Sequence, residues 1–172
     1  MTTITAQGHQ IFKTLSNNAM FRKHVKSSQG EVIKGAIISV LISPTEPQLS
    51  FVKKVIQLHK KYYLYCDSGD FLVVTKDFKG IVKFNIRKPN VKFKQHFNSQ
   101  WMVEIDNLHS LKKGYGKMLL EEVLLIANEI KCEVCLWTEN ESNADYFKKF
   151  GFESYGHIGD AKENLMIRKL VK

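Results

Sequence analysis

The sequence predicts a mixed α/β domain in which a sheet and helices form packed layers. Short segments rich in valine, isoleucine and aromatic residues alternate with longer segments whose apolar residues recur every three or four positions. The chain has 172 residues, which suffices for one ordinary domain with a substantial core, and it contains no internal repeat or low-complexity segment. We therefore expect a single domain over residues 1–172.

The first half of the chain supplies five of the predicted elements. Residues 31–42 are rich in valine and isoleucine, which favours a buried strand. The prolines at 44 and 47 interrupt the chain before the next helix. The turn KDFKG separates two apolar segments and indicates a hairpin. The predicted helices are 9–25 and 48–61, and the predicted strands are 31–42, 71–75 and 81–88.

The second half alternates strands and helices more regularly. After a looser basic segment to about residue 100, a strand precedes a loop with two glycines and a helix that ends near residue 130. That helix has an apolar stripe at i, i+3 and i+4 spacing. A shorter helix is ended by Gly151. The predicted strands are 101–106, 134–138, 152–157 and 163–170, and the shorter helix is 141–151.

Composition sets the class of protein. Apolar residues make up 44% and charged residues 25%, as in a soluble globular protein, and the apolar runs are far shorter than a membrane span. The first residues, MTTITAQGHQIFK, lack the apolar region of a signal peptide. Three cysteines, Cys66, Cys132 and Cys135, are too few for a disulfide framework. We therefore expect a cytoplasmic protein with no membrane partner.

Net charge indicates an anionic partner without choosing one. The formal charge of +9 suits nucleic acid, a membrane surface or a phosphorylated cofactor. The basic residues are spread along the chain with no block of five or more, so a solvated lysine-rich surface explains the charge equally well.

The loop KKGYGK, residues 112–117, is a candidate anion site. The first turn of a helix has amide N–H groups without intrahelical partners, and the helix dipole favours an anion there. Because Gly114 and Gly116 lack a Cβ, phosphate oxygens can approach the backbone, and three lysines add attraction. The plain alternative is a strand-to-helix turn with solvated lysines. The loop matches neither a Walker A loop nor a Rossmann fingerprint.

The order of these motifs resembles the GNAT N-acetyltransferase superfamily. The order is strand, K-K-G-Y-G-K, long helix, strand, asparagine, short helix, G-F and strand, and the resemblance covers about 101–170. It extends back to about 31 only through element order. The resemblance implies a mixed, mostly antiparallel sheet with helices on both faces, and acetyl-CoA as co-substrate. It also divides the chain into an N-terminal helical extension (1–30), an acceptor side (31–100) and an acetyl-CoA-binding half (101–172).

The resemblance also implies the cofactor-binding residues. The family motif Q/R-x-x-G-x-G/A, whose backbone amides bind the pyrophosphate of acetyl-CoA, maps onto 111–116, with Leu111 where the family has Gln or Arg. A later family pattern maps onto 140–152, where Asn143 replaces the usual alanine and Phe147 the usual tyrosine. A splayed strand supplies the oxyanion donor. The implied residues are Ile105, Asp106, Asn107, Leu111, Lys112, Lys113, Gly114, Tyr115, Gly116, Lys117, Asn140, Asn143 and Phe147.

Acetyl transfer to an amine requires a base and benefits from an acid. An ammonium with a pKa of roughly 10.4 is no nucleophile until it loses a proton. Glu104, on the strand that should carry the acetyl group, is the first candidate base, with Asp106 and His109 as weaker ones; a solvated or paired carboxylate is the alternative for Glu104. Because Phe147 cannot donate a proton, Tyr146 is the candidate acid, although it lies about 100° around the helix. Tyr115, Tyr155 or water could also serve.

No metal site is predicted. Cys132 and Cys135 form C-E-V-C, but residues three apart on a strand face opposite sides of the sheet. No second cysteine pair completes a set of four ligands.

Three functions remain open at this point. The first is an acetyl-CoA-dependent N-acetyltransferase that acts on a primary amine, in a small molecule or a protein, by direct attack in a ternary complex. The second is a catalytically weak or inactive protein of the same fold that binds CoA or a protein partner, because Leu111 and Phe147 depart from the family pattern. The third, ranked last, is a nucleic-acid-binding protein whose basic residues Lys83, Arg87, Lys92 and Lys94 touch phosphates. A homodimer is compatible with each.

Overall fold

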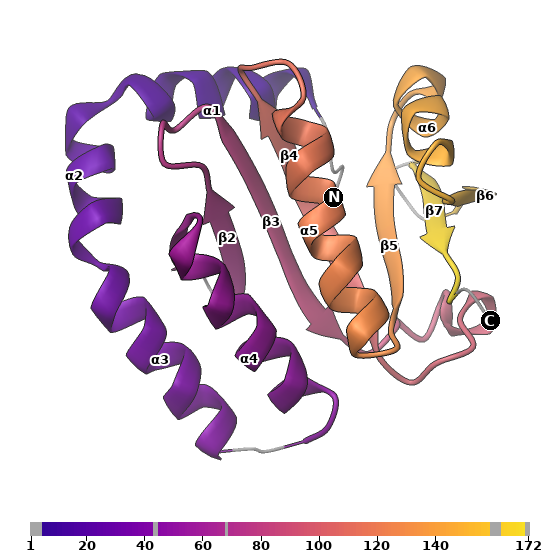
Figure 1. Ribbon diagram of the computed structural model, residues 1–172. Coiled ribbons are helices and arrows are strands. Elements are labelled where there is room, and N and C mark those ends of the chain that lie inside the picture. Colours follow the sequence, from indigo (N-terminus) through magenta and orange to yellow (C-terminus); the bar gives the residue numbers. More distant parts are fainter. Residues whose placement is uncertain (1–4, 43–44, 68, 159–162, 171–172) are drawn as a thin grey trace.

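The chain folds around one seven-stranded sheet (Figure 1). The computed structural model describes residues 5–42, 45–67, 69–158 and 163–170. The strand order is β1-β2-β3-β4-β5-β7-β6, in which β4 and β5 are parallel and every other neighbouring pair is antiparallel. The strands are β1 (Tyr63–Asp67), β2 (Asp70–Val74), β3 (Gly80–Arg87), β4 (Met102–Ser110), β5 (Glu133–Thr138), β6 (Glu153–His157) and β7 (Asn164–Arg168).

Helices cover both faces of the sheet, which confirms the predicted fold class. The main core joins one sheet face to α3, α4, α5 and α6, with Phe51, Leu120 and Phe147 at its centre. On the opposite face, α1 and α2 pack through Phe12 and Val25. The helices are α1 (Ala6–Asn17), α2 (Ala19–Ser27), α3 (Gln29–Ile42), α4 (Gln48–Gln57), α5 (Tyr115–Glu129) and α6 (Glu141–Lys148).

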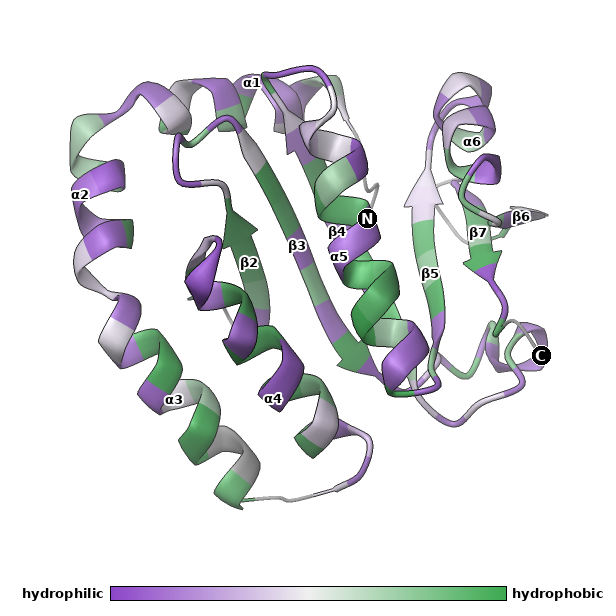
Figure 2. Cartoon of the chain, in the orientation of Figure 1, coloured by the Kyte–Doolittle hydropathy of each residue, from purple (hydrophilic) through white to green (hydrophobic). Residues whose placement is uncertain are grey.

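Among the described residues, the second sheet face is covered only at its two ends. One end lies under α1 and α2, and the other is covered by Phe93 and Phe97 from the segment around the short 3-10 turn Lys94–His96. Between these covers the strands present polar side chains, and β3 carries hydrophobic and hydrophilic residues along its length (Figure 2). This uncovered strip is called the open face below.

The prediction of a strand at 31–42 is wrong, because these residues form helix α3. The run is longer than most strands, and its backbone hydrogen bonds close locally from the first turn, where Val32 N donates to Ser28 O at 3.0 Å. Strand preference of β-branched residues is a weak prior that packing overrides. The helix buries Ala36, while Ile37 and Leu41 are exposed.

Helix α3 also protects an edge of the sheet. Strand β1 is the outermost strand on this side and was not predicted from the sequence. The side-chain amide of Gln29 donates to Leu64 O at 2.6 Å and accepts from Leu64 N at 2.8 Å, as a neighbouring strand would. These two hydrogen bonds occupy backbone groups at the edge of β1 that could otherwise pair with a strand of another chain.

The remaining elements follow the sequence prediction closely. The segment 9–25 is two helices, because Asn18 interrupts it and its side chain accepts from Phe21 N at the start of α2. The hairpin of β2 and β3 and the elements from β4 to β7 are confirmed, although β4 runs to Ser110. Gly151, with φ of +83°, follows α6 as predicted. Within the described residues, no helix is long and apolar enough to cross a membrane.

Candidate functional site

Strands β4 and β5 part at their carboxyl ends. Their parallel ladder runs from Met102–Glu133 to Ile105–Leu136, while both strands continue beyond it. A β-bulge lies at the same place, because Phe84 of β3 pairs with Ile105 whereas Lys83 pairs with Asn107. Asp106 is therefore the extra residue of β4. Bulges bend a strand and re-aim its side chains, so the sheet opens into a split after Ile105.

The glycine loop lies beside this split, where α5 begins. Gly114 has φ of +88°, in the left-handed region, and no side chain caps the helix. A Cβ on Gly116 would meet Ser110 Oγ at 3.5 Å and Tyr146 Oη at 3.8 Å. The N–H of Tyr115 donates to Lys112 O at 3.2 Å, so among the described residues the N–H groups of Gly116 and Lys117 are left to an external acceptor, as an anion site requires.

A pocket of about 600 Å³ connects the glycine loop to the end of β4 and to α6. Its walls come from five parts of the fold, including α1, which contributes His9. Sequence reasoning did not predict His9 or Ser142 as site residues. The sequence-predicted residues that line the pocket are His109, Lys113, Gly114, Gly116, Lys117, Asn143 and Tyr146.

Two residues of the glycine loop turn away from this pocket. Lys112 Nζ donates to Tyr115 Oη at 2.9 Å, and that hydroxyl donates to Asp77 Oδ2 at 2.9 Å on the turn between β2 and β3. Leu111 packs into the apolar cluster under α1 and α2. Tyr115 is therefore engaged on the far side of the loop from α6.

Helix α6 presents one of its two predicted aromatic residues to the pocket. Phe147 is fully buried in the main core, with its ring centroid 5.7 Å from that of Phe152. Tyr146 lines the pocket, and burial raises the pKa of its phenol, with a smaller contribution from Glu121. The hydroxyl is therefore a donor at neutral pH. Asn140 accepts from Asn143 N at 2.8 Å and caps α6.

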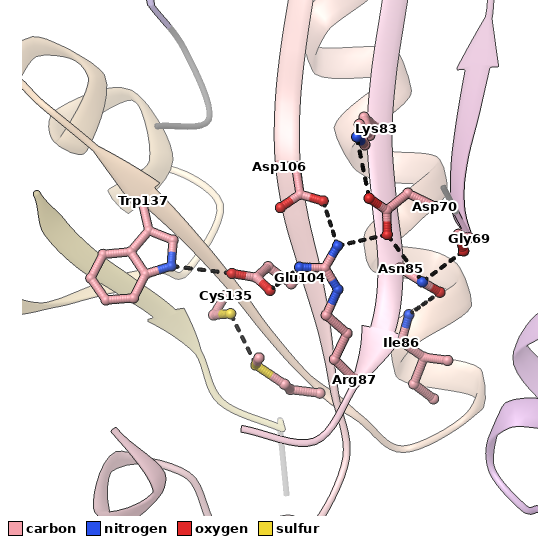
Figure 3. Close-up of polar contacts among 11 residues, drawn as sticks. Gly69, Asp70, Lys83, Asn85, Ile86, Arg87, Glu104, Asp106, Cys135 and Trp137 are labelled. Carbon is pink, nitrogen blue, oxygen red and sulfur yellow. Dashed lines mark hydrogen bonds and ion pairs between the residues drawn. The ribbon is translucent and has the colours of Figure 1, made fainter. Parts of the chain in front are cut away.

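An ion-pair cluster occupies the open face beside the split (Figure 3). Arg87 of β3 donates to Asp70 at 2.6 Å, to Glu104 at 2.7 Å and to Asp106 at 2.9 Å. These four residues are called the Arg87 cluster. The second oxygen of Glu104 accepts from Trp137 Nε1 at 3.2 Å, so both oxygens of Glu104 are engaged.

The carboxyls of the cluster differ in acidity. Burial raises the pKa of Asp106 to about 6, even though Arg87 acts in the opposite sense. Burial acts on Asp70 as well, but hydrogen bonds from Arg87 and Lys83 outweigh it and lower the pKa of Asp70. Asp106 is thus the carboxyl of this pair that can exchange a proton near neutral pH.

His109 lies where β4 meets α1. Its ring stacks on Phe12, and burial lowers the pKa of the imidazole to about 4, with a further contribution from His9. Nδ1 is buried and has no hydrogen-bond partner among the described residues. A neutral, buried imidazole of this pKa is a poor base for an ammonium ion.

The two cysteines of C-E-V-C are buried and apart from the pocket. Cys135 Sγ lies 3.0 Å from Met102 Sδ, and burial raises the pKa of both thiols. Within the described part of the chain, no three His, Cys, Asp or Glu side chains are grouped as metal ligands.

Several solved structures resemble this chain at low sequence identity. An acetyltransferase from Corynebacterium glutamicum, related to histone acetyltransferase HPA2, is 12% identical and has a TM-score of 0.49, covering 85% of this chain and 93% of its own. NAA60 of Arabidopsis thaliana, bound to a bisubstrate analogue, is 14% identical with a TM-score of 0.44, covering 81% and 93%. PaiA N-acetyltransferase of Thermoplasma acidophilum, bound to coenzyme A, is 12% identical with a TM-score of 0.41, covering 86% and 94%.

No family model and no curated protein matches the sequence. The architecture itself is specific: a mostly antiparallel sheet, one parallel pair that parts at its carboxyl ends, and a glycine loop that leads into the helix between the two strands of that pair. These features are the ones that the sequence resemblance to the GNAT superfamily implies for the fold.

Proposed function

We propose that this protein is an acetyl-CoA-dependent N-acetyltransferase that transfers the acetyl group to a primary amine by direct attack in a ternary complex. One observation carries the proposal: the split between β4 and β5 opens beside the uncapped start of α5. Coenzyme A combines a diphosphate, which suits a helix N-terminus, with an extended amide-containing arm, which suits an unpaired strand edge. Lys113 and Lys117 line the same pocket and add favourable charge.

The residues present fit this co-substrate in three places. The amides of Gly114 and Gly116 would hold the diphosphate, and backbone near the bulge at residues 105–107 would hold the acetyl carbonyl. A Cβ on Gly116 would lie 3.8 Å from the hydroxyl of Tyr146, and this closeness to the glycine loop supports a contact of the hydroxyl with the diphosphate. We therefore assign Tyr146 to phosphate binding rather than to protonation of the sulfur.

A CoA-binding protein without strong catalysis is the second candidate. The observation that favours it is the burial of Phe147 in the core, which leaves the family's tyrosine position without a hydroxyl. Nucleic-acid binding has less support, because Lys83 and Arg87 are held by carboxylates on the open face.

Coenzyme A is expected to raise the melting temperature of the protein. A ligand that binds only the folded state stabilises it by about 2.7 kcal/mol at a hundredfold excess over Kd. For a domain of this size, that corresponds to a shift of roughly 5–10 °C in a thermal scan. No shift at millimolar CoA would contradict the proposal.

The variant Gly116→Val is expected to remove this shift by blocking the diphosphate. Gly116 is the better choice than Gly114, whose positive φ strains any other side chain, because a Cβ at 116 meets only ordinary contacts. The matched control is Gly30→Val, on α3, where a Cβ has nothing within 4 Å. Gly30→Val should keep the full shift, and a normal melting curve of Gly116→Val without CoA shows that it folds.

Tyr146→Phe is expected to weaken CoA binding by roughly 2–10-fold, the loss of one hydrogen bond of about 0.5–1.5 kcal/mol. The rate at saturating acetyl-CoA should change little. The control is Tyr155→Phe, because Tyr155 packs with the cluster at the other end of the sheet. Calorimetric titration measures the affinity, and a large fall in kcat with intact binding would instead make Tyr146 the acid.

A further inference from the structure

The proposed cofactor pocket leaves the Arg87 cluster unused. The cluster draws its side chains from β2, β3 and β4 on the open face, whereas the glycine loop and α6 line the pocket at the ends of these strands. Buried carboxylates of this kind are costly to maintain, which suggests a role beyond stability.

Asp106 lies where the split begins. Ile105, its neighbour, forms the last pair of the β4–β5 ladder and points into the main core, as does Leu108. By the alternation of the strand, Asp106 lies on the same face as Glu104, and its carboxylate is turned toward Arg87 (Figure 3). A thioester held in the split would therefore be reached from the open face past this carboxylate.

Asp106 also has a free oxygen, in contrast to Glu104. Its Oδ2 accepts from Arg87, while Oδ1 has no hydrogen-bond partner among the described residues (Figure 3). Both oxygens of Glu104 are occupied, by Arg87 and Trp137. A base needs an unoccupied lone pair within reach of the proton that it takes.

The charge of the cluster indicates the class of acceptor. Three carboxylates face two cations, Arg87 and Lys83, so one negative charge is unmatched in a chain whose net charge is +9. A negative spot in a positive protein attracts a cation and disfavours an acceptor with a carboxylate near its amine.

Resting on the proposed function, we propose that the Arg87 cluster is the acceptor site, that its acceptor is a protonated primary alkylamine, and that Asp106 is the catalytic base. One ammonium proton passes to Asp106 and then to solvent. The freed nitrogen lone pair forms the C–N bond at the acetyl carbonyl, and the C–S bond breaks with its electron pair on sulfur. The second proton lost from nitrogen, as the amide forms, passes through solvent to the CoA thiolate.

The groups that face Asp106 define the expected pH dependence. They are Arg87 and Lys83 from β3, Asp70 from β2, Glu104 on the same strand, and the thiol of Cys135 on β5. The neighbouring cations and carboxylates act on Asp106 in opposite directions, and burial is the largest influence. The kcat/KM for the acceptor should therefore decrease as the pH is lowered through about 6, because Asp106 becomes protonated there.

The experiment compares the wild type with Asp106→Asn and Glu104→Gln over pH 5–9, with release of the CoA thiol as the readout. The acceptors are butane-1,4-diamine, a lysine-containing peptide, and 2,2,2-trifluoroethylamine, which is unprotonated at pH 8. Asp106→Asn should lower kcat/KM for the first two at neutral pH by roughly 10²–10⁴. Its pH profile should lose the inflection near pH 6 and rise steadily to pH 9, because only acceptor that is already a free amine, with a pKa of roughly 10.4, can then react. Its kcat/KM for trifluoroethylamine should change far less, because that amine needs no base. Glu104→Gln should keep the inflection.

The outcomes separate this inference from the proposed function. An inflection near pH 6 that persists in Asp106→Asn, or disappears in Glu104→Gln, overturns the assignment of the base. CoA binding without acetylation of either alkylamine overturns the acceptor class, and preference for the peptide or the diamine distinguishes the two sources of the amine. Absence of CoA binding overturns the proposed function itself. Folding of Asp106→Asn is checked by its melting temperature at pH 8, which should be no lower than that of the wild type.

Discussion

Arg87→Gln is expected to lower the free energy of unfolding by about 3–5 kcal/mol at pH 7, the usual cost of removing one partner from a buried ion pair. Arg87 holds three carboxylates whose side chains are at most 15% exposed. Without the guanidinium, these charges repel one another on a surface with little water, and Lys83, which forms an ion pair with Asp70 at 3.2 Å, is a single charge against three. Urea unfolding at pH 7 measures the loss.

The pH dependence of this loss identifies its cause. The unfolded pKa of an aspartic acid is roughly 3.9. When the pKa is higher than this in the folded state, the ionised carboxylate destabilises the folded protein, and this destabilisation is lost as the pH falls through the folded-state pKa. Arg87 lowers the pKa of Asp106, so without Arg87 this carboxyl takes up its proton above a pH of about 6, and the deficit of Arg87→Gln should shrink as the pH falls toward 6. A deficit that is constant between pH 5 and 8 would contradict this account.

Two variants act as controls for Arg87→Gln. Arg87→Lys keeps the charge but cannot reach three carboxylates at once, so its loss should be intermediate. Lys34→Gln breaks an exposed ion pair with Glu31, whose side chains are 68% and 78% exposed, and should cost at most about 0.5 kcal/mol.

Phe147→Ala is expected to lower the free energy of unfolding by about 3–5 kcal/mol. The ring is fully buried between α6 and the sheet, and its removal leaves a cavity that Tyr146 and Phe152 cannot fill. Phe147→Tyr should cost about 1–3 kcal/mol, because its hydroxyl would enter an apolar core without a partner. Both losses are measured by urea unfolding.

The comparison with Tyr146→Phe tests the orientation of α6. Tyr146 lines the pocket, so removal of its hydroxyl should change the free energy of unfolding by less than about 1 kcal/mol. If Phe147→Tyr proved neutral in stability and raised the rate of acetyl transfer, then position 147 would reach the sulfur and α6 would be rotated from the structure described above.

The sequence predicted the second half of the fold, from residue 101 onward, because its signals there are local. A glycine loop, an amphipathic stripe and a helix ended by Gly151 each act within a few residues, and the structure has all three. The strand prediction for residues 31–42 was wrong because their composition favours a strand, whereas their packing on α4 and β1 stabilises a helix. Strand β1 was missed although Tyr63 and Tyr65 lie on one side of the strand and Leu64 on the other.

The Arg87 cluster had no signal in the sequence. In the sequence, Arg87 was grouped with basic residues that would touch phosphates in a nucleic-acid-binding protein. Glu104 was ranked above Asp106 as the candidate base. The four residues lie between positions 70 and 106, and they come together because of the register of three strands and one bulge. That register depends on the whole sheet. The bulge that returns Leu108 to the core leaves no mark in composition.

The outward side of α3 has a consequence for how the protein behaves in solution. Four aliphatic side chains on it are between 46% and 78% exposed: Ile37, Ile38, Leu41 and Ile42. Copies of a chain with a net charge of +9 repel one another, and this repulsion opposes contact between their aliphatic sides. Salt shortens the range of that repulsion to roughly 10 Å at 0.1 M, whereas the attraction between apolar surfaces persists. Ionic strength therefore governs the colloidal stability of this protein, and dilute buffer keeps its molecules apart.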